Sequence, residues 1–564
     1  MRNFLLFIAA LTMTLVGSSQ DRPAFNRGSY FSAEMRSYDR AMASKVPVLK
    51  LPDHQRSLAL PVSVDNSQHK FFPGILDQGY NMTCQQFAGV SYLFAYEINR
   101  LRNVSASEPE NQYPEKYTYN FMNGGNAENG VSFFYSWDAI KRQGHPGADV
   151  FPGIDTLSSY GWMTGYDKYY SAMKNRLKQV YSIPVNTEEG ILTLKHYLFN
   201  HLDGSSTGGI AVLGTSANFY GNIQPIPEGS PEAGKGILTG FFPLATHGLT
   251  IVGYNDSIRF DLNADGRYTN DLDITGDGIV NPKDWEKGAY RVANSYGITW
   301  EDSGYCWMMY RAFALDYDEG LSGWTSTCGV WNEAVYTLEP IADYIPLLTI
   351  KVSLNHTRRN MISVKAGISA NAASQLPEYI MEFPIWDYQG GEMPLNVMHP
   401  ELPAMEAGFD ITPLLSYVEP GKACRLFFIL DENDPDNKAT GAIETVSFIS
   451  YLNGTSVIPA GDTDVAITNN SSTLLSAVFT PEFNKVRITN EDLPPYIPLQ
   501  PYSFQMQAEG GTPPYNWSLL KPSLKIQTDS LYPLINQQEL FPQSIAVPYH
   551  QVILPFAFPF QGKE

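Results

Sequence analysis

Cysteine is scarce in this chain: Cys84, Cys306, Cys328 and Cys424 are the four cysteines among 564 residues. This number excludes a disulfide framework as the main source of stability. Basic residues are also few, with 38 Lys and Arg against 58 Asp and Glu, so the formal net charge is −20. An acidic surface repels a phosphate backbone, and we therefore expect no nucleic-acid partner.

Long apolar runs are missing beyond the first twenty residues. There, Arg2 precedes an apolar run at 4–16 and a group of small residues, which is typical of a secretory signal peptide at 1–19. No later stretch approaches ~18 unbroken apolar residues, so we expect no transmembrane segment. The chain is therefore predicted to be secreted or held at the cell surface.

The length is too great for one hydrophobic core and predicts about three or four domains. Residues 20–58 have the mixed, Pro-punctuated texture of a leader or short pro-segment. Residues 59–339 form the first expected domain, in which helical patterns precede strand patterns, an α+β arrangement. The expected helices are 84–101, 133–143 and 188–200, and the expected strands are 210–213, 249–254, 290–293 and 305–310.

Strand-like runs separated by Pro, Gly, Asn and Asp turns dominate the rest of the chain. They predict a β-sandwich accessory domain at 340–491. Residues 492–545 resemble a bacterial Ig-like module, and 546–564 start a new apolar pattern that we expect to belong to a further, truncated domain.

Cys84 lies at the start of the expected helix 84–101. Thr83 and Gln86 fit a capping box, and apolar residues recur at helical spacing beyond them. In the first turn, the helix dipole and the free amides favour a thiolate. Such a cysteine is a nucleophile if an imidazole can take its proton, and otherwise a small buried hydrophobe.

Three further segments occur in a telling order around this cysteine. Gln78 precedes Cys84 by six residues, His247 opens an expected strand, and Asn294 follows another in Asn-Ser-Tyr-Gly. Because these segments occur in this order, residues 60–311 resemble the papain-like cysteine peptidase family. The resemblance implies a two-lobed catalytic domain, followed here by the β-sandwich and Ig-like modules.

The roles that this resemblance implies are specific. Cys84 would be the nucleophile, His247 the general base, Asn294 the residue that orients the imidazole, and Gln78 an oxyanion donor together with the Cys84 amide. Segment 129–146 resembles the part that holds extended substrate, and 209–220 a wall of the specificity pocket. The implied substrate-contacting residues are Gly130, Val131, Ser132, Val212 and Leu213. Departures from the family pattern are Gln85 and Tyr296, where tryptophan is usual, Asn81 in place of a cysteine, and the lack of a long pro-segment.

An acidic insertion at 256–288 separates His247 from Asn294. Its segment 273–284 fits a twelve-residue calcium loop of dockerin type, with a glycine at position six. The expected calcium ligands are Asp273, Thr275, Asp277, Ile279, Asn281 and Asp284. A second, less complete loop opens with Asp261, Asn263 and Asp265, and a solvated turn is the alternative for both. We expect Ca²⁺ to order the insertion and to stiffen the strands that carry His247 and Asn294, with no catalytic cofactor.

These patterns predict a secreted peptidase that acts on proteins or peptides through a Cys84 acyl-thioester. The β-modules are expected to be accessory, with attachment to a cell surface or glycan as one role and a spacer as another. Two alternatives remain: an inactive scaffold that serves as an adhesin, and a transferase that uses the same thioester. Cys306 and Cys328 either pair or pack as thiols, and His196 and His201 are expected to be ordinary residues of a helix.

Overall fold

The structure is a computed structural model that describes residues 33–152, 159–217, 223–243, 245–318, 327–399, 401, 403–484, 487–488 and 507–509. The expected signal peptide at 1–19 and the truncated domain at 546–564 lie outside the described residues. The same holds for the expected Ig-like module at 492–545, apart from 507–509. No helix among the described residues has both the length and the apolar character needed to cross a membrane.

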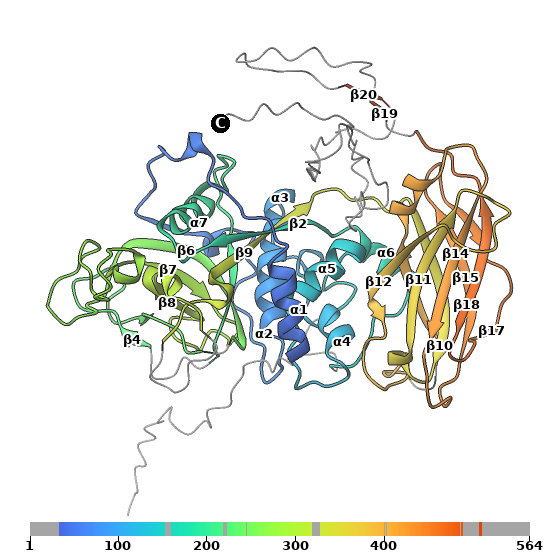
Figure 1. The fold of residues 1–564 in the computed structure, drawn as a ribbon, viewed down its shortest axis with the longest axis horizontal. Helices are drawn as coiled ribbons and strands as arrows, with labels where there is room; N and C mark the ends of the chain where they lie inside the picture. Colours follow the sequence, from blue (N-terminus) through green and yellow to red (C-terminus); the bar gives the residue numbers. More distant parts are fainter. Residues whose placement is uncertain are drawn as a thin grey trace, which may run out of the picture.

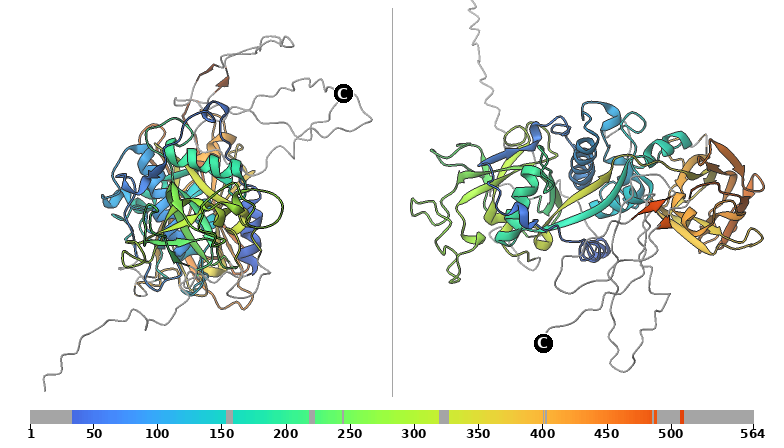
Figure 2. Two further views of the ribbon diagram at one scale, coloured as in Figure 1. Left: turned by 90° about the vertical axis from the view of Figure 1, so that its left-hand side faces the viewer. Right: turned by 90° about the horizontal axis from the view of Figure 1, so that it is seen from above.

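Three groups of elements follow one another along the long axis: a mixed sheet, a central group of helices and a pair of stacked sheets (Figures 1 and 2). Helices and several sheets both occur, which confirms the α+β class at this level. The helices are α1 Ala33–Ala43, α2 Cys84–Gln86, α3 Ala95–Arg102, α4 Lys116–Met122, α5 Phe133–Gln143, α6 Tyr166–Met173, α7 Glu188–Asn200 and α8 Tyr310–Ala314.

The helix expected at 84–101 is continuous but changes character along its length. Between α2 and α3, residues Phe87–Phe94 form a π-helical stretch, η3, whose residues are all buried. π-helical stretches are rare and frequently occur at functional sites. Leu101 is 44% exposed, so the expected apolar face ends before it. The boundaries expected for α5 and α7 are confirmed.

The mixed sheet runs in the order β2-β9-β3-β6-β7-β8-β5-β4, with β1 paired to β6. Its strands are β1 Ser63–Asp65, β2 Arg176–Pro184, β3 Ala211–Thr215, β4 Gln224–Pro225, β5 Gly236–Leu238, β6 His247–Arg259, β7 Lys287–Ala293, β8 Tyr305–Met309 and β9 Ala334–Ile341. Strands β6 and β7 are antiparallel, with Thr250 opposite Ala293. The start of β6 and the end of β7 therefore lie at the same edge of the sheet.

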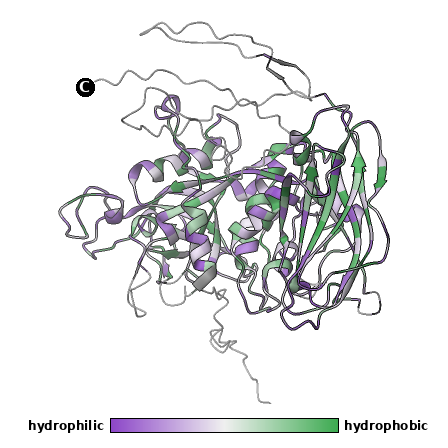
Figure 3. Ribbon diagram, turned by 45° about the vertical axis from the view of Figure 1, so that its right-hand side comes forward, coloured by the Kyte–Doolittle hydropathy of each residue, from purple (hydrophilic) through white to green (hydrophobic). Residues whose placement is uncertain are grey.

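The stacked sheets consist of β13-β10-β15-β16, to which β17 adds, and β12-β11-β14-β18. Their strands are β10 Leu348–His356, β11 Ile362–Ser369, β12 Tyr379–Asp387, β13 Met405–Asp410, β14 Cys424–Glu432, β15 Gly441–Ser450, β16 Ser456–Pro459, β17 Val465–Ala466 and β18 Ser472–Phe479. These strands are themselves hydrophobic over much of their length (Figure 3). Beyond them, β19 Arg487–Ile488 pairs with β20 Ala508–Glu509.

One hydrophobic cluster spans the stacked sheets and the central helices. It includes Phe121 and Trp162 from the helical side together with Trp386 and Phe409 from the sheets. Helix α1 and residues that follow it also pack on the rest of the chain, because Tyr38 stacks on Tyr135 at a centroid distance of 3.8 Å. The described residues of the expected leader, 33–58, therefore pack against the rest of the chain.

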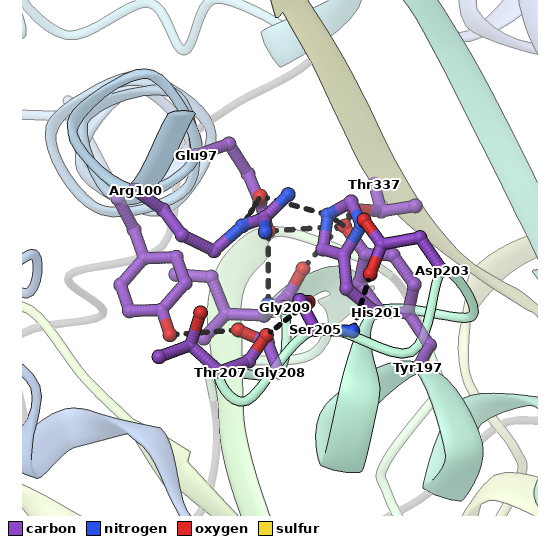
Figure 4. A network of polar contacts seen from close by, with 12 residues as sticks. Glu97, Arg100, Tyr197, His201, Asp203, Ser205, Thr207, Gly208, Gly209 and Thr337 are labelled. Carbon is purple, nitrogen blue, oxygen red and sulfur yellow. Dashed lines mark hydrogen bonds and ion pairs between the residues drawn. The ribbon is translucent and has the colours of Figure 1, made fainter. Parts of the chain in front are cut away.

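A buried polar network ties α3 to α7 and to the mixed sheet (Figure 4). The fully buried carboxylate of Glu97 accepts hydrogen bonds from the Tyr197 hydroxyl at 3.0 Å and the Ile210 amide at 3.1 Å. It also pairs with Arg100 Nε at 3.2 Å and His201 Nε2 at 3.1 Å. His201 follows the end of α7 with a φ of 57°, and its side chain packs against this buried carboxylate.

Candidate active site

Cys84 is the first residue of α2, and its side chain is fully buried. The expected capping box is wrong, because the Thr83 side chain makes no capping hydrogen bond. Gln86 is used elsewhere: its Nε2 donates to the Val131 carbonyl at 2.6 Å. The helix start is thus held by a contact with the segment that precedes α5.

His247 and Asn294 come together at the sheet edge where β6 begins and β7 ends. The distance between His247 Nε2 and Asn294 Oδ1 is 2.8 Å, and both side chains are buried. The Ser295 amide also donates to Asn294 Oδ1, at 2.8 Å. Since Asn294 Oδ1 is an acceptor, Nε2 is the ring nitrogen that carries the proton in this hydrogen bond. Tyr296 covers the pair, with its ring centroid 4.9 Å from that of His247.

The start of α2 lies against the start of β6. Cys84 Sγ is 3.8 Å from the carbonyl oxygen of Thr246, the residue before His247. Gly248 makes this approach possible, because a Cβ there would lie 3.1 Å from the Gln85 Cα and 3.2 Å from the Ala88 Cβ. The structure therefore brings Cys84, His247 and Asn294 into one place from segments far apart in the sequence.

Gln78 belongs to the same group and has a fixed amide. The Ser295 hydroxyl donates to its Oε1 at 2.5 Å, while its Nε2 donates to the Asn81 carbonyl at 2.7 Å. Its backbone amide donates to the Ser295 carbonyl at 2.8 Å. The two side-chain contacts fix which end of the Gln78 amide is the oxygen and which is the nitrogen.

Sequence reasoning missed three residues of this site. Asn81 was noted only as a departure from a family pattern, yet its carbonyl orients Gln78. Ser295 stood inside Asn-Ser-Tyr-Gly, and its hydroxyl fixes the same amide. Gly248 directly follows His247, and no signal in one sequence distinguishes its role from that of any strand glycine.

The expected substrate-contacting residues are buried. The side chains of Val131, Val212 and Leu213 are fully buried in hydrophobic clusters, and a contact of these residues with substrate stays a prediction. Ser132 is also buried and caps α5 by accepting the Phe134 amide at 3.1 Å. For Gly130 and Ser132, a contact with substrate through the backbone stays a prediction.

The two expected calcium loops curl in the same way. Asp273 Oδ2 accepts the Gly278 amide at 2.8 Å, and Asp261 Oδ2 accepts the Gly266 amide at 2.8 Å, so position one closes on position six in each. Asp284 is buried and accepts loop amides, including that of Thr275 at 2.8 Å. Within the described residues, no three His, Cys, Asp or Glu side chains cluster closely enough to hold a metal ion. Calcium therefore stays a prediction.

The insertion joins the end of β6 to the start of β7, whereas His247 and Asn294 lie at the opposite ends of these strands. Thirteen residues of extended strand span about 40 Å. An effect of Ca²⁺ on the pair would therefore have to pass along these strands, and it stays a prediction. The fully buried Glu286, which sequence reasoning missed, closes the base of the insertion by accepting the amides of Leu262 at 2.8 Å and Thr269 at 3.0 Å.

All four cysteines are buried thiols that form no disulfide among the described residues, so Cys306 and Cys328 pack as thiols. Burial raises the pKa of each of the three outside the site, that of Cys424 to about 11. These three thiols are accordingly inert at neutral pH.

Neither a family model nor a curated protein matches the chain. Among solved structures, it is similar to a recombinant stem bromelain precursor, with 17% identity over 52% of this chain and 74% of that chain, and a TM-score of 0.33. It is also similar to xylellain, a cysteine protease from Xylella fastidiosa, with 15% identity over 56% and 96% of the two chains and a TM-score of 0.35. A procathepsin B from Trypanosoma congolense matches with 14% identity over 56% and 87%, at a TM-score of 0.34. These structural neighbours are papain-like cysteine proteases, matched at low identity over about half of this chain.

Proposed function

We propose that this chain is a cysteine peptidase that hydrolyses peptide bonds through an acyl-thioester on Cys84. The observation that carries the proposal is the buried 2.8 Å hydrogen bond between His247 Nε2 and Asn294 Oδ1, next to the helix start that bears Cys84. An imidazole whose Nε2 is held by an amide oxygen presents Nδ1 to a proton donor on its other side. A thiol at a helix start is the donor that this arrangement suits.

The proposed reaction follows from these positions. The Cys84 thiol gives its proton to His247 Nδ1, and the thiolate attacks the peptide carbonyl carbon. The resulting oxyanion accepts hydrogen bonds from the Cys84 amide and from Gln78 Nε2, whose orientation Ser295 and Asn81 fix. The imidazolium then protonates the leaving amine as the C–N bond breaks, leaving an acyl-thioester. Water, deprotonated by the same ring, breaks the C–S bond and restores the thiol.

Selective alkylation of Cys84 tests this proposal. Iodoacetamide near pH 6 should label the wild type with one equivalent, because a Cys–His pair is ionised there while isolated thiols are not. Cys84→Ser should abolish labelling and peptide hydrolysis. Cys424→Ser is the matched control and should change neither, since burial raises the pKa of that thiol to about 11. Equal labelling of the wild type and Cys84→Ser would exclude an activated thiolate at residue 84.

We propose in addition that the chain is exported and acts on proteins or peptides, and that attachment to a surface or glycan falls to its β-rich parts. The expected signal peptide supports export. Product analysis with an added amine distinguishes hydrolysis from transfer, because a transferase would join the amine to the acyl group.

We also propose that Ca²⁺ binds the loop 273–284 and stabilises the insertion locally. The residues that would hold it are Asp273, Asp277 and Asp284 with oxygens of Thr275, Ile279 and Asn281, and the curled loop supports this fit. Adding Ca²⁺ to chelator-treated protein should raise the unfolding temperature, and Asp273→Asn with Asp277→Asn should remove the increase. Because the loop lies far from His247, peptidase activity below the unfolding temperature should be unchanged; a parallel loss of activity would contradict a purely local role.

A further inference from the structure

The stacked sheets and the central helices meet at two pairs of glycines. Gly124 and Gly125 form a turn on the helical side, and Gly390 and Gly391 form a turn between β12 and β13; all four have positive φ, between 65° and 83°. A Cβ on Gly125 would lie 2.9 Å from the Gly390 carbonyl oxygen, and one on Gly391 would lie 2.5 Å from that of Gly124. The two backbones are therefore in direct contact, and no larger residue fits there.

Arg359 is buried beside this contact. It lies in a short 3-10 turn, Arg359–Met361, just before β11, and has no exposed surface. Its Nη1 donates to the Tyr160 carbonyl at 2.7 Å and its Nε to the Gly390 carbonyl at 2.8 Å, while the guanidinium lies 4.5 Å from the Trp162 ring centroid. It thus connects the sheets to the segment 159–162 of the helical side.

This arginine has no acidic partner among the described residues. Burial lowers the pKa of Arg359 to about 10, and no carboxylate acts against that shift. A buried cation without a counter-charge is costly, and an apolar side chain would fill the same space at lower cost. What the guanidinium adds is direction, because its planar fork fixes two carbonyl groups relative to each other.

Segment 159–162 in turn forms hydrogen bonds with residues near Gln78. The Ser159 carbonyl accepts the Asn123 side-chain amide at 2.7 Å, and the Ser159 hydroxyl donates to Asn81 Oδ1 at 3.4 Å. The Asn81 carbonyl accepts Gln78 Nε2 at 2.7 Å. Hydrogen bonds and short covalent stretches, from Tyr160 to Ser159 and through Asn81, therefore link Arg359 in the sheets to the proposed oxyanion donor.

We propose that Arg359 is a positioning residue of the active site: through segment 159–162 and Asn81 it fixes the amide of Gln78. The inference rests on the proposed peptidase function and extends it, because the stacked sheets become part of the oxyanion site. A spacer or a separate binding module would need no such contact.

The test compares Arg359→Met with Arg358→Met. Met fills the space of the arginine stem without its directed hydrogen bonds, whereas Arg358 pairs within the sheets with Glu392 and Asp434. We expect Arg359→Met to lower kcat about tenfold with KM little changed, since an oxyanion donor acts in the transition state. Arg358→Met should leave kcat unchanged. If Arg359→Met fails to fold, Arg359→Lys, which keeps the charge but not the planar fork, takes its place.

A double-mutant cycle separates positioning from mere stability. In a Gln78→Ala background, Arg359→Met should cause no further loss of kcat, because its effect passes through that amide. Equal losses in both backgrounds would overturn the proposal and leave Arg359 a structural residue.

A readout without turnover keeps the proposal distinct from the peptidase function. Amide hydrogen exchange in 78–86 should become faster in Arg359→Met and stay unchanged in Arg358→Met. Unchanged exchange in both variants would overturn the positioning role even if Cys84 is labelled selectively. Failure of selective Cys84 labelling, with exchange as expected, would overturn the peptidase function and leave the link from Arg359 to Gln78 standing.

Discussion

Gly248 shows how a residue with no side chain defines the proposed active site. It follows His247 in β6 and lies opposite Gly214 of β3, where α2 comes closest to the sheet. Because the Gln85 backbone is 3.1 Å from the position of a Cβ, any side chain at 248 has to move α2 and its cysteine away from β6.

Gly248→Ala should therefore slow alkylation of Cys84 near pH 6 about tenfold, since misplacements of a fraction of an ångström already lower rates at such sites. The unfolding temperature should change by only a few degrees. Gly214→Ala is the matched control, because the three atoms nearest to a Cβ there all belong to Trp331, the closest at 3.2 Å, and none belongs to α2. Equal alkylation rates in Gly248→Ala and the wild type would contradict the role of this close approach.

Glu97 is the residue whose ionisation should matter most for stability. Burial raises the pKa of Glu97, but His201, Arg100 and the Ile210 amide together hold it below its usual value. A carboxyl group with a lowered pKa in the folded state stabilises the fold above its unfolded pKa of 4.5 and loses that contribution as the pH falls further.

Glu97→Gln should consequently lower the free energy of unfolding by about 1–3 kcal/mol at pH 7, because His201 and Arg100 lose their acceptor. The difference from wild type should shrink as the pH falls below the ordinary glutamate pKa of 4.5 and Glu97 itself becomes protonated. Urea unfolding at pH 7 and pH 3 measures both values. Glu189→Gln, which breaks only an exposed pair with Arg56, should have little effect at either pH. A deficit of equal size at both pH values would show that charge is not the cause.

At the scale of elements, α1 packs against the rest of the chain with a buried carboxyl group, that of Asp39. Asp39 is buried against the region of Ser132, and burial raises its pKa to about 7, with the Ser132 hydroxyl and Arg40 acting in the opposite direction. A raised pKa means that docking of α1 is strongest below the usual Asp pKa of 3.8 and weakens as the pH rises through 7.

Limited proteolysis should accordingly cut the segment 33–58 faster at pH 8.5 than at pH 5, relative to a reference peptide. Asp39→Asn should remove this difference, because the neutral amide does not ionise and its burial costs the same free energy at both pH values. Arg40→Gln, at an exposed position of the same helix, is the control and should keep most of it. Cleavage that is independent of pH in the wild type would show that Asp39 does not govern docking.

At the scale of the whole molecule, the stacked sheets and the central helices share one core. Arg176 of β2 forms a buried ion pair with Asp410 of β13, and the Tyr344 hydroxyl also donates to that carboxylate. The Asp410 amide donates to the Gln143 side chain at 3.0 Å. Removing the sheets would take the partner carboxylate away from Arg176 and would expose apolar side chains such as Trp162.

A chain that ends at residue 343 should therefore be insoluble or should unfold at least 10 °C below the full chain. A chain that ends at residue 484 keeps both sheets and should match the full chain in unfolding temperature. Differential scanning calorimetry of the two truncated chains provides the comparison. If the chain that ends at residue 343 is soluble and as stable as the chain that ends at residue 484, the sheets are an independent accessory unit.

Local pattern predicted much of this molecule. Helical spacing indicated α5 and α7 with their ends, and strand-like runs separated by turn residues indicated β10, β11, β14, β15 and β18. It failed where a side chain has two competing partners: Gln86 was expected to close a capping box but bonds the Val131 carbonyl instead. It also did not indicate how deeply Val212 and Leu213 are buried, because a strand pattern does not distinguish a core face from a cleft.

The sequence by itself determined which groups could do chemistry: one cysteine at a helix start, one histidine opening a strand, and an Asn and a Gln in fixed order around them. These are local properties of composition and spacing. Only the tertiary structure decided that Gly248 lets the helix start with Cys84 approach the strand that begins at His247, that Ser295 fixes the amide of Gln78, and that Arg359 of the sheets bonds the Tyr160 carbonyl. The physical reason is that these contacts join segments more than a hundred residues apart, and their strength depends on distance and burial, which no single stretch of sequence contains.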